Sequence, residues 1–191
     1  MDVDRVAACA TPAEARAARR AGLRAAVVGI GASRGVPAGR LVSFGVAGGL
    51  RPARSLEVGT VIDATRIVDG QGRELWAGPG LGIPGARPGT IAATDRIADD
   101  PAERLRLRER TGADAVDLES GILAATGRLD GCVRAVSDTP ARPLGPLVEA
   151  VTPAGRPRPA GLARALLREP RATLHALGDV RRALKALEGS S

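Results

Sequence analysis

The chain has 191 residues, of which 44% are hydrophobic and 26% are charged. This length can bury one sizeable core but not two comfortable ones, and the composition excludes a disordered protein. The two cysteines, Cys9 and Cys132, belong to no Cys-x-x-Cys motif and no Cys/His cluster, which excludes a disulfide-stapled mini-domain. We therefore expect a globular domain in a reducing compartment.

The net charge of +7 is concentrated near the C-terminus. Residues 156–191 hold eight cations and three anions, a net of +5, so the rest of the chain is nearly neutral. Only 1% of the residues are aromatic, too few for the base stacking used by single-strand binders, and we expect no nucleic-acid partner. No apolar run could span a bilayer and the N-terminus is too acidic for a secretion signal, so a cytoplasmic location is expected.

Short runs rich in valine and isoleucine, each closed by glycine or a polar turn, are typical of the buried strands of an α/β protein. Between several of them lie patterns typical of helices. In chain order the sequence predicts strand 5–10, helix 12–21, strands 25–30, 41–46 and 60–68, a Gly/Pro-rich loop 69–88, strand 90–94, helix 101–110, strand 113–118, helix 119–126, strand 132–137, and helices 160–168 and 172–187. This alternation predicts one α/β domain with a largely buried sheet.

Three of the predicted helices carry further information. Helix 12–21 begins with Thr11, Pro12 and Glu14, the pattern of a capping box. Helix 101–110 is so highly charged that we expect it to face solvent. Helix 172–187 has leucines at spacings of three and four with arginines off that stripe. The stripe either packs on the protein's own core or rests on an anionic membrane surface.

The first motif is SFGVAGGL, residues 43–50, in which a strand runs into a glycine-rich turn. Glycine lets the backbone approach a ligand closely, although a plain tight turn after a buried strand explains the motif as well.

The second motif is VDLES, residues 116–120, in which a strand ends in Asp117 and Glu119. Residues two apart in a strand point to one side, and a glutamate there can accept hydrogen bonds from a vicinal diol such as that of ribose. Alternatively, both acids simply favour the N-terminus of the next helix.

The third motif is VRAVSD, residues 133–138, a buried strand that ends in Ser137 and Asp138. Partial desolvation at the mouth of an apolar strand raises the pKa of a carboxyl, which suits Asp138 as a general acid. It could equally cap the turn before Pro140.

These three motifs, in this order and spacing, resemble those of the nucleoside phosphorylase and nucleosidase superfamily. The superfamily includes purine nucleoside phosphorylases and methylthioadenosine/S-adenosylhomocysteine nucleosidases. Within it, the wording of the motifs and the basic tail are most similar to the hopanoid-associated phosphorylases, which are assigned to removing adenine from adenosylhopane. The resemblance implies a mixed central sheet flanked by helices over residues 1–155, with a C-terminal helical extension over residues 156–191.

The resemblance also implies site residues. Asp138 would protonate N7 of the leaving adenine, Glu119 would bind ribose hydroxyls, and Glu14 would activate a water molecule. The other substrate-binding residues implied are Ala47, Gly48, Gly49, Ile97, Leu118 and Ser137. Glu14 is also explained by the capping box, in which its side chain only reaches back to the cap amide.

Some residues depart from the family pattern. Only about ten residues separate the Gly29-Ile30-Gly31 turn from the next strand, so the first crossover is too short for the usual helix. The stacking aromatic that relatives carry after Asp95 is absent, and Arg96 and Ile97 stand there instead. Val46 replaces the serine or threonine with which many phosphorylases bind phosphate, so water is favoured as nucleophile and phosphate stays an alternative co-substrate.

The sequence thus predicts an enzyme that cleaves the N-glycosidic bond of a 5′-modified adenosine, with adenosylhopane as the preferred substrate. The alternatives are a general purine nucleoside phosphorylase or methylthioadenosine-type nucleosidase, and a catalytically weakened relative that binds nucleosides or contacts a membrane. No metal or other cofactor is expected. The expected partners are a small nucleoside, also in lipid-linked form, further copies of the chain in a homo-oligomer, and the inner face of the membrane.

Overall fold

The computed structural model describes residues 5–52 and 55–189. Strands and helices alternate as predicted, except that the 69–88 segment, predicted as a loop, contains a short strand and the start of another. The elements are β1 (Arg5–Cys9), α1 (Pro12–Arg20), β2 (Arg24–Val27), the 3₁₀ turn η1 (Ile30–Ala32), β3 (Arg40–Gly49), β4 (Val61–Asp69), β5 (Glu74–Ala77), β6 (Arg87–Ala93), α2 (Pro101–Thr111), β7 (Ala115–Asp117), α3 (Ser120–Ala124), β8 (Leu129–Asp138), the 3₁₀ turn η2 (Gly145–Ala150), α4 (Pro159–Arg168) and α5 (Pro170–Glu188).

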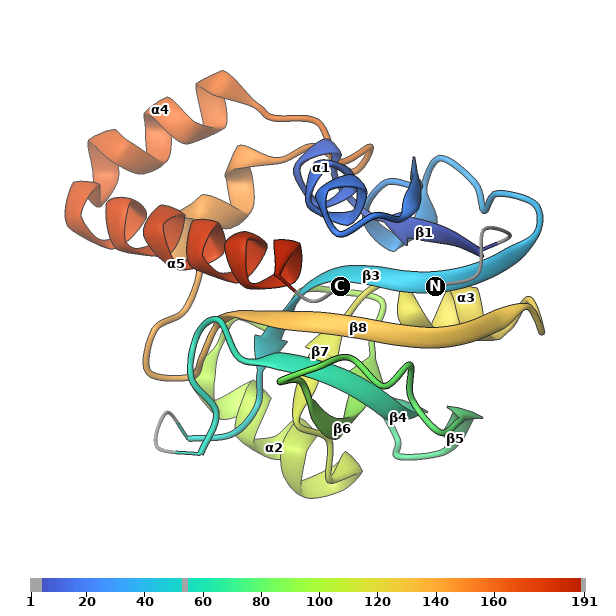
Figure 1. Ribbon diagram of the computed structural model, residues 1–191. Helices are drawn as coiled ribbons and strands as arrows, with labels where there is room; N and C mark the ends of the chain where they lie inside the picture. The colour runs from blue at the N-terminus through green and yellow to red at the C-terminus, as the bar shows by residue number, and fades with distance from the viewer. Residues whose placement is uncertain (1–4, 53–54, 190–191) are drawn as a thin grey trace.

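Strand β3 is the centre of a mixed sheet (Figure 1). It is parallel to β1 and β8 and antiparallel to β7. Strand β8 continues to β4, which pairs with β6, and β6 pairs with β7, so that five strands close a ring. The predicted mixed sheet is therefore confirmed, and part of it is curled into a distorted barrel.

Helices α1 and α5 cover the outer face of β3 and β8, whereas α2 lies on the other side of the sheet (Figure 1). Small side chains line this contact, since Ala15 and Ala18 of α1 and Ala183 of α5 are buried against Phe44 and Val133. Alanine at these positions lets the helices approach the strands closely, which offsets the scarcity of large apolar residues in the chain.

The leucine stripe of α5 faces the chain's own core. Leu187 is fully buried, and Leu177, Val180 and Leu184 are partly buried in clusters with η2 and α1. Leu174, at the start of the stripe, is 59% exposed. Most of the stripe is therefore packed on the core of the chain. Among the described residues, no helix is both long enough and apolar enough to cross a membrane.

The prediction that helix 101–110 faces solvent is wrong for one side of α2, where Arg104, Leu107 and Thr111 are buried. The helix begins with the side chain of Asp100 accepting a hydrogen bond from the Ala102 amide, and it ends at Gly112 in the left-handed conformation. Arg104, however, is 1% exposed and extends toward the end of β8. A charged pattern cannot reveal this burial, because the partner carboxylate lies 34 residues away.

The short crossover predicted after residues 29–31 is confirmed. Only the turn η1 stands between β2 and β3, where a longer connection would place a helix. Gly31 has a positive φ of 56° and donates its amide to the Glu119 carboxylate over 2.9 Å. The turn thus reaches the end of β7 directly.

Candidate active site

The pairing of β3 with β8 places the predicted site residues at two positions along these strands. Gly45 pairs with Arg134, whereas Gly48, three residues further along, pairs with Asp138. Three residues of strand span about 10 Å. The site therefore consists of two groups about one nucleoside length apart, which we call the Arg134 cluster (Glu14, Asp117, Glu119 and Arg134) and the Asp138 pair (Asp138 and Arg104).

The Arg134 cluster is a buried arginine with three carboxylates around it. Arg134 donates its Nε to Asp117 over 2.6 Å and an NH2 to the Ser43 hydroxyl over 2.7 Å. The Glu119 carboxylate lies 3.7 Å from the same guanidinium. Both acids of the second motif thus face one cation, although β7 ends at Asp117 and does not continue to Glu119. Asp117 also caps α3, since its other oxygen accepts the Ser120 amide and hydroxyl.

Glu14 completes the predicted capping box and also contacts the glycine-rich end of β3. One carboxylate oxygen accepts the Thr11 amide and hydroxyl, which completes the capping box of α1. The other oxygen accepts the Val46 amide over 2.9 Å, on the glycine-rich strand end. The side chain is 4% exposed. A capping glutamate therefore lies against the same stretch of β3 as Arg134.

Glu119 is a buried acid whose pKa is raised. Burial, followed by the charge of Asp117, raises its pKa to about 7, against the opposing effect of Arg134. Glu119 therefore changes charge near neutral pH. This is the range in which a carboxyl can act both as acceptor and as donor to a diol.

Asp138 is held from two sides. The Ser137 hydroxyl donates to Oδ1 over 2.5 Å, and Arg104 forms a buried ion pair with Oδ2. Burial raises the pKa of Asp138, and the charge of Arg104 opposes that rise. The carboxylate does not cap the following turn, where Thr139 and Arg142 pair through their backbones. The alternative interpretation of this residue as a turn cap is therefore wrong.

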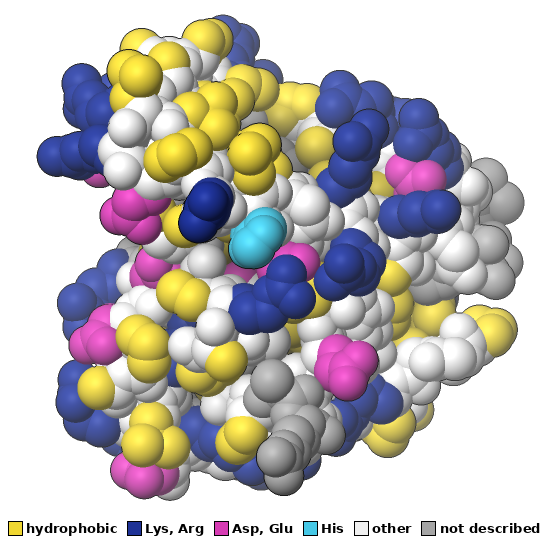
Figure 2. All heavy atoms as spheres, turned by 90° about the vertical axis from the view of Figure 1, so that its left-hand side faces the viewer, with side chains coloured by type: hydrophobic (Ala, Val, Ile, Leu, Met, Phe, Trp, Pro, Cys, Tyr) yellow, Lys and Arg dark blue, Asp and Glu magenta, His cyan; other side chains and the backbone are white. Residues whose placement is uncertain are grey.

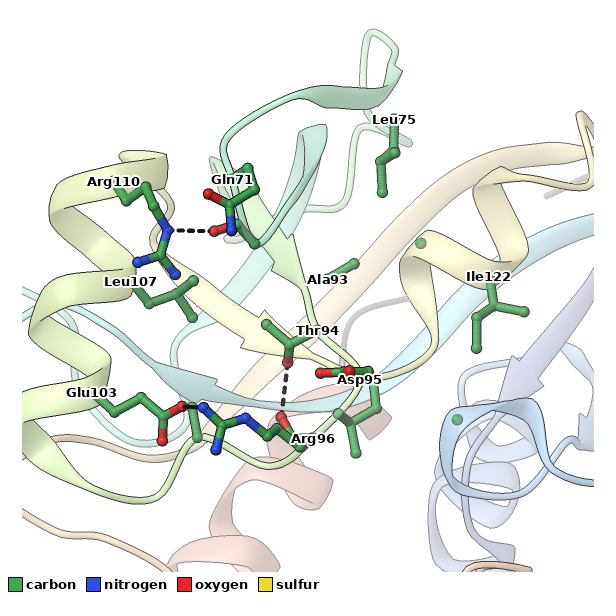
Figure 3. A pocket seen from close by; sticks show the side chains of 15 residues that line it. Gln71, Leu75, Ala93, Thr94, Asp95, Arg96, Glu103, Leu107, Arg110 and Ile122 are labelled. Carbon is green, nitrogen blue, oxygen red and sulfur yellow. Dashed lines mark hydrogen bonds and ion pairs between the residues drawn. The ribbon is translucent and has the colours of Figure 1, made fainter.

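A cavity of about 730 Å³ opens beside these groups, between α2, α3 and the ends of β6 and β7 (Figure 3). Thr94, Asp95 and Arg96 lie on its floor, and Leu107 and Arg110 of α2 lie on one side. Its wall includes Gly31 and Leu118, which touch or adjoin Glu119, and Ala98, whose carbonyl accepts Arg104. The cavity thus reaches the backbone next to both groups, while the carboxylates of Glu119 and Asp138 lie buried behind its wall.

The remaining predicted binding residues lie at different depths. Leu118 lines the cavity, whereas Ile97 is 39% exposed and stands between two lining residues. Ala47 is buried, and its carbonyl accepts the Ser137 hydroxyl over 3.3 Å. The Gly49 carbonyl accepts Arg104 over 3.3 Å. The predicted glycine-rich turn is wrong, since residues 47–49 continue β3 as strand, and this strand end lies against Asp138.

Gly45 is the position where the Arg134 cluster tolerates no side chain. A Cβ there would lie 2.3 Å from Glu14 Oε1 and 2.9 Å from Arg134 NH1. We expect Gly45→Ala to lower the free energy of unfolding by about 1 to 3 kcal/mol through overpacking, measured by urea denaturation. The control is Gly178→Ala in α5, where nothing lies within 4 Å and the variant should be stabilised by up to about 1 kcal/mol. Equal effects of the two variants would contradict this account of Gly45.

The burial of two arginines, Arg104 and Arg134, is not predicted from the sequence. Arg134 is the one charge inside the apolar run VRAVS, and such an interruption could have marked a buried ion pair. For Arg104 no comparable signal exists, since it is one arginine of four in α2. Within the described residues, no group of three or more His, Cys, Asp or Glu side chains is placed to hold a metal ion.

Comparison with solved structures finds the same fold at low sequence identity. The chain aligns with the 5′-methylthioadenosine/S-adenosylhomocysteine nucleosidase of Campylobacter jejuni at 18% identity and a TM-score of 0.52, covering 98% of this chain and 99% of that one. The corresponding enzyme of Helicobacter pylori, an aspartate-to-asparagine mutant with 5′-methylthioadenosine in its active site, aligns at 15% identity with a TM-score of 0.53, covering 95% and 99%. The chain has the fold of these nucleosidases.

The Helicobacter pylori futalosine hydrolase also aligns, at 14% identity and a TM-score of 0.50, over 94% of this chain and 97% of that one. No model of a protein family matches the chain, and no curated protein matches it. The nucleosidase fold spans nearly the whole chain, including α4 and α5.

Proposed function

We propose that the protein hydrolyses the N-glycosidic bond of a 5′-modified adenosine and releases adenine. The observation that carries this proposal is the spacing of the two groups along β3. Asp138, a buried acid, pairs with β3 three residues beyond the pairing position of Arg134, whose cluster has an excess of carboxylates, and three strand residues span about 10 Å of backbone. Cleavage of this bond builds negative charge on the base and positive charge on the sugar, so the two ends of a nucleoside need these two environments.

At the base end, Asp138 is the proton donor. Its proton passes to N7 of adenine while the C1′–N9 bond breaks and the bonding electrons move to the base. Burial favours the protonated carboxyl, and the Ser137 hydroxyl fixes its orientation.

At the sugar end, the three carboxylates of the Arg134 cluster outnumber its single guanidinium. An excess of negative charge in a buried site stabilises the ribosyl cation more than it stabilises the neutral ground state. Glu119 accepts hydrogen bonds from the ribose hydroxyls. The positive charge of Arg134, which pairs with Asp117 and Glu119, reduces the repulsion between the carboxylates.

Water is the nucleophile in this proposal. Its oxygen bonds to C1′ and its proton passes to Glu14, which lies against the strand end at Val46. An apolar side chain at position 46 offers no hydroxyl to a phosphate ion. Ala47, Gly48 and Gly49 provide the backbone surface against which sugar and nucleophile lie.

We assign the cavity to the 5′ substituent and to the entry of the nucleoside. The motif resemblance supports adenosylhopane as the first candidate substrate. Contact with the inner face of the membrane is part of the proposal, and it is supported by the turn between α4 and α5, where Leu167 is 85% exposed beside Arg168 and Arg171. Figure 2, which faces the side of α4 and α5, shows cationic and apolar side chains intermingled there. A homo-oligomer is proposed on the resemblance alone.

One observation favours a second function, that of a nucleoside-binding protein without turnover. Arg104 forms an ion pair with Asp138, the carboxyl that would have to donate a proton to the base. Such a protein would bind adenine or its nucleosides and leave the glycosidic bond intact.

The deciding experiment measures free adenine by chromatography from 5′-methylthioadenosine, S-adenosylhomocysteine and a lipid-linked 5′-substituted adenosine in anionic vesicles, each with and without phosphate. We expect release that is independent of phosphate, because Val46 offers phosphate no hydroxyl. A preference for the vesicle-borne substrate would support the lipid assignment, and release that requires phosphate would identify a phosphorylase. Binding of adenine without release from any substrate would establish the second function instead.

A further inference from the structure

Arg104 connects the cavity to Asp138. On α2, Glu103 and Leu107 belong to the cavity wall, whereas Arg104 points the other way and is 1% exposed. Its Nε donates to the Ala98 carbonyl over 2.6 Å, and its NH2 group faces Asp138 Oδ2. One turn of helix thus carries both the wall of the entry space and the partner of the acid.

This arrangement leaves Asp138 no free position for a base. Oδ1 accepts the Ser137 hydroxyl and Oδ2 is paired with Arg104. The space beside them is narrow, since a Cβ on Gly48 would lie 3.2 Å from Asp138 Oδ2 and 3.3 Å from Arg104 NH2. A purine can therefore meet this carboxyl only after the guanidinium has moved.

A second acid is placed to receive the displaced arginine. Asp99 lies 3.4 Å from Arg104 NH2, and its side chain is 29% exposed, against 3% for Asp138. The amides of Leu144 and Gly145 donate to the Asp99 carboxylate over 3.0 and 2.9 Å and hold it in place. The guanidinium can exchange the buried carboxylate for the more exposed one without losing an ionic partner.

We propose that Arg104 is a positioning residue that pairs with Asp138 in the free protein and is displaced toward Asp99 by the purine base of the substrate. This inference rests on the proposed function. As Arg104 leaves, Asp138 takes up a proton from solvent, and that proton is the one later given to N7. The acid thus forms only when a base is present to receive its proton.

The physical basis is the balance of effects on Asp138. Burial raises the pKa of its carboxyl, Arg104 lowers it, and the charge of Asp99 raises it. Arg104 on α2 and Asp99 in the segment before it are the charged groups that face Asp138 within the described part of the chain. Removal of Arg104 leaves burial and the charge of Asp99, which both raise the pKa of Asp138, against the hydrogen bond from Ser137, which lowers it.

The test compares two pH profiles of adenine release. The profile of kcat/KM reports the free protein, with Arg104 in place, and the profile of kcat reports the complex, with Arg104 displaced. In the wild type, the loss of kcat at high pH should occur about one to three pH units above the loss of kcat/KM, the range expected for a neighbouring opposite charge. In Arg104→Met, kcat and kcat/KM should be lost at the same pH. Arg106→Met, on the exposed side of α2, is the matched control and should keep the wild-type separation.

Two measurements keep the inference falsifiable if Arg104→Met folds poorly. Arg104→Lys retains the positive charge but not the several N–H donors of the guanidinium. It should reduce the pH difference between the loss of kcat and the loss of kcat/KM. The carboxyl carbon resonance of Asp138, followed by NMR, should titrate at higher pH in wild-type protein with adenine than without it. The role of Arg104 would be overturned if both variants kept the wild-type pH difference between the losses of kcat and kcat/KM. It would also be overturned if adenine had no effect on the titration of Asp138. Absence of adenine release from every nucleoside by the wild type would overturn the proposed function instead.

Discussion

Replacing Asp138 by asparagine is expected to reduce kcat for adenine release by about 10²- to 10⁴-fold, the contribution typical of a general acid. The amide has nearly the shape of the carboxyl but has no proton to give to N7. The measurement is free adenine by chromatography under saturating substrate. The KM should change less than kcat, because the proton is transferred in the transition state and not on binding.

The matched control is Asp130→Asn at the other end of β8, where the carboxylate pairs with Arg5 and Arg40. It should retain nearly full activity. Because Asp138→Asn leaves Arg104 buried without its carboxylate, folding of the variant must be verified by circular dichroism and thermal unfolding. A folded Asp138→Asn variant with wild-type kcat would exclude Asp138 as the acid.

Much of this site could be predicted from the sequence, because each motif ends a strand. The motif residues of β3 and β8 meet because the two strands are parallel neighbours, and a register shift between Ala47 and Gly48 places Gly48 opposite Asp138. Asp117 and Glu119 both face Arg134, but β7 ends at Asp117 and Glu119 already has helical backbone, so strand alternation does not explain their shared side.

Other features depend on contacts between distant segments, which no local pattern reports. The charged sequence of α2 predicts a solvent-exposed helix and does not indicate that Arg104 is buried. The partner of Arg104 comes from the end of β8. Glycine and proline dominate residues 69–88 and predict a loop, yet the backbone of β5 in this segment pairs with β4. The stripe of α5 allowed a membrane or the core as partner, and only tertiary packing selected the core for most of it.

Glu119→Gln is expected to change the pH dependence of stability. An unfolded chain loses the Glu119 proton near the ordinary pKa of 4.5, whereas the folded protein keeps it up to about 7. Between these values the folded state binds more protons, so the free energy of unfolding of the wild type falls as pH rises, by about 3 kcal/mol from this group, and is flat above. Glutamine does not titrate, and its carbonyl can still accept the Gly31 amide.

The stability of Glu119→Gln relative to the wild type should therefore increase by about 3 kcal/mol from pH 4.5 to pH 8, measured by urea denaturation at both values. Glu57→Gln, which alters an exposed carboxyl, should show no such trend. A pH-independent difference for Glu119→Gln would mean that Glu119 titrates in the folded protein as it does in the unfolded chain. The same variant should lose adenine release, since an amide binds ribose hydroxyls without supplying negative charge to the ribosyl cation. Gain of stability with loss of activity would thus identify Glu119 as a residue whose burial costs stability and serves the reaction.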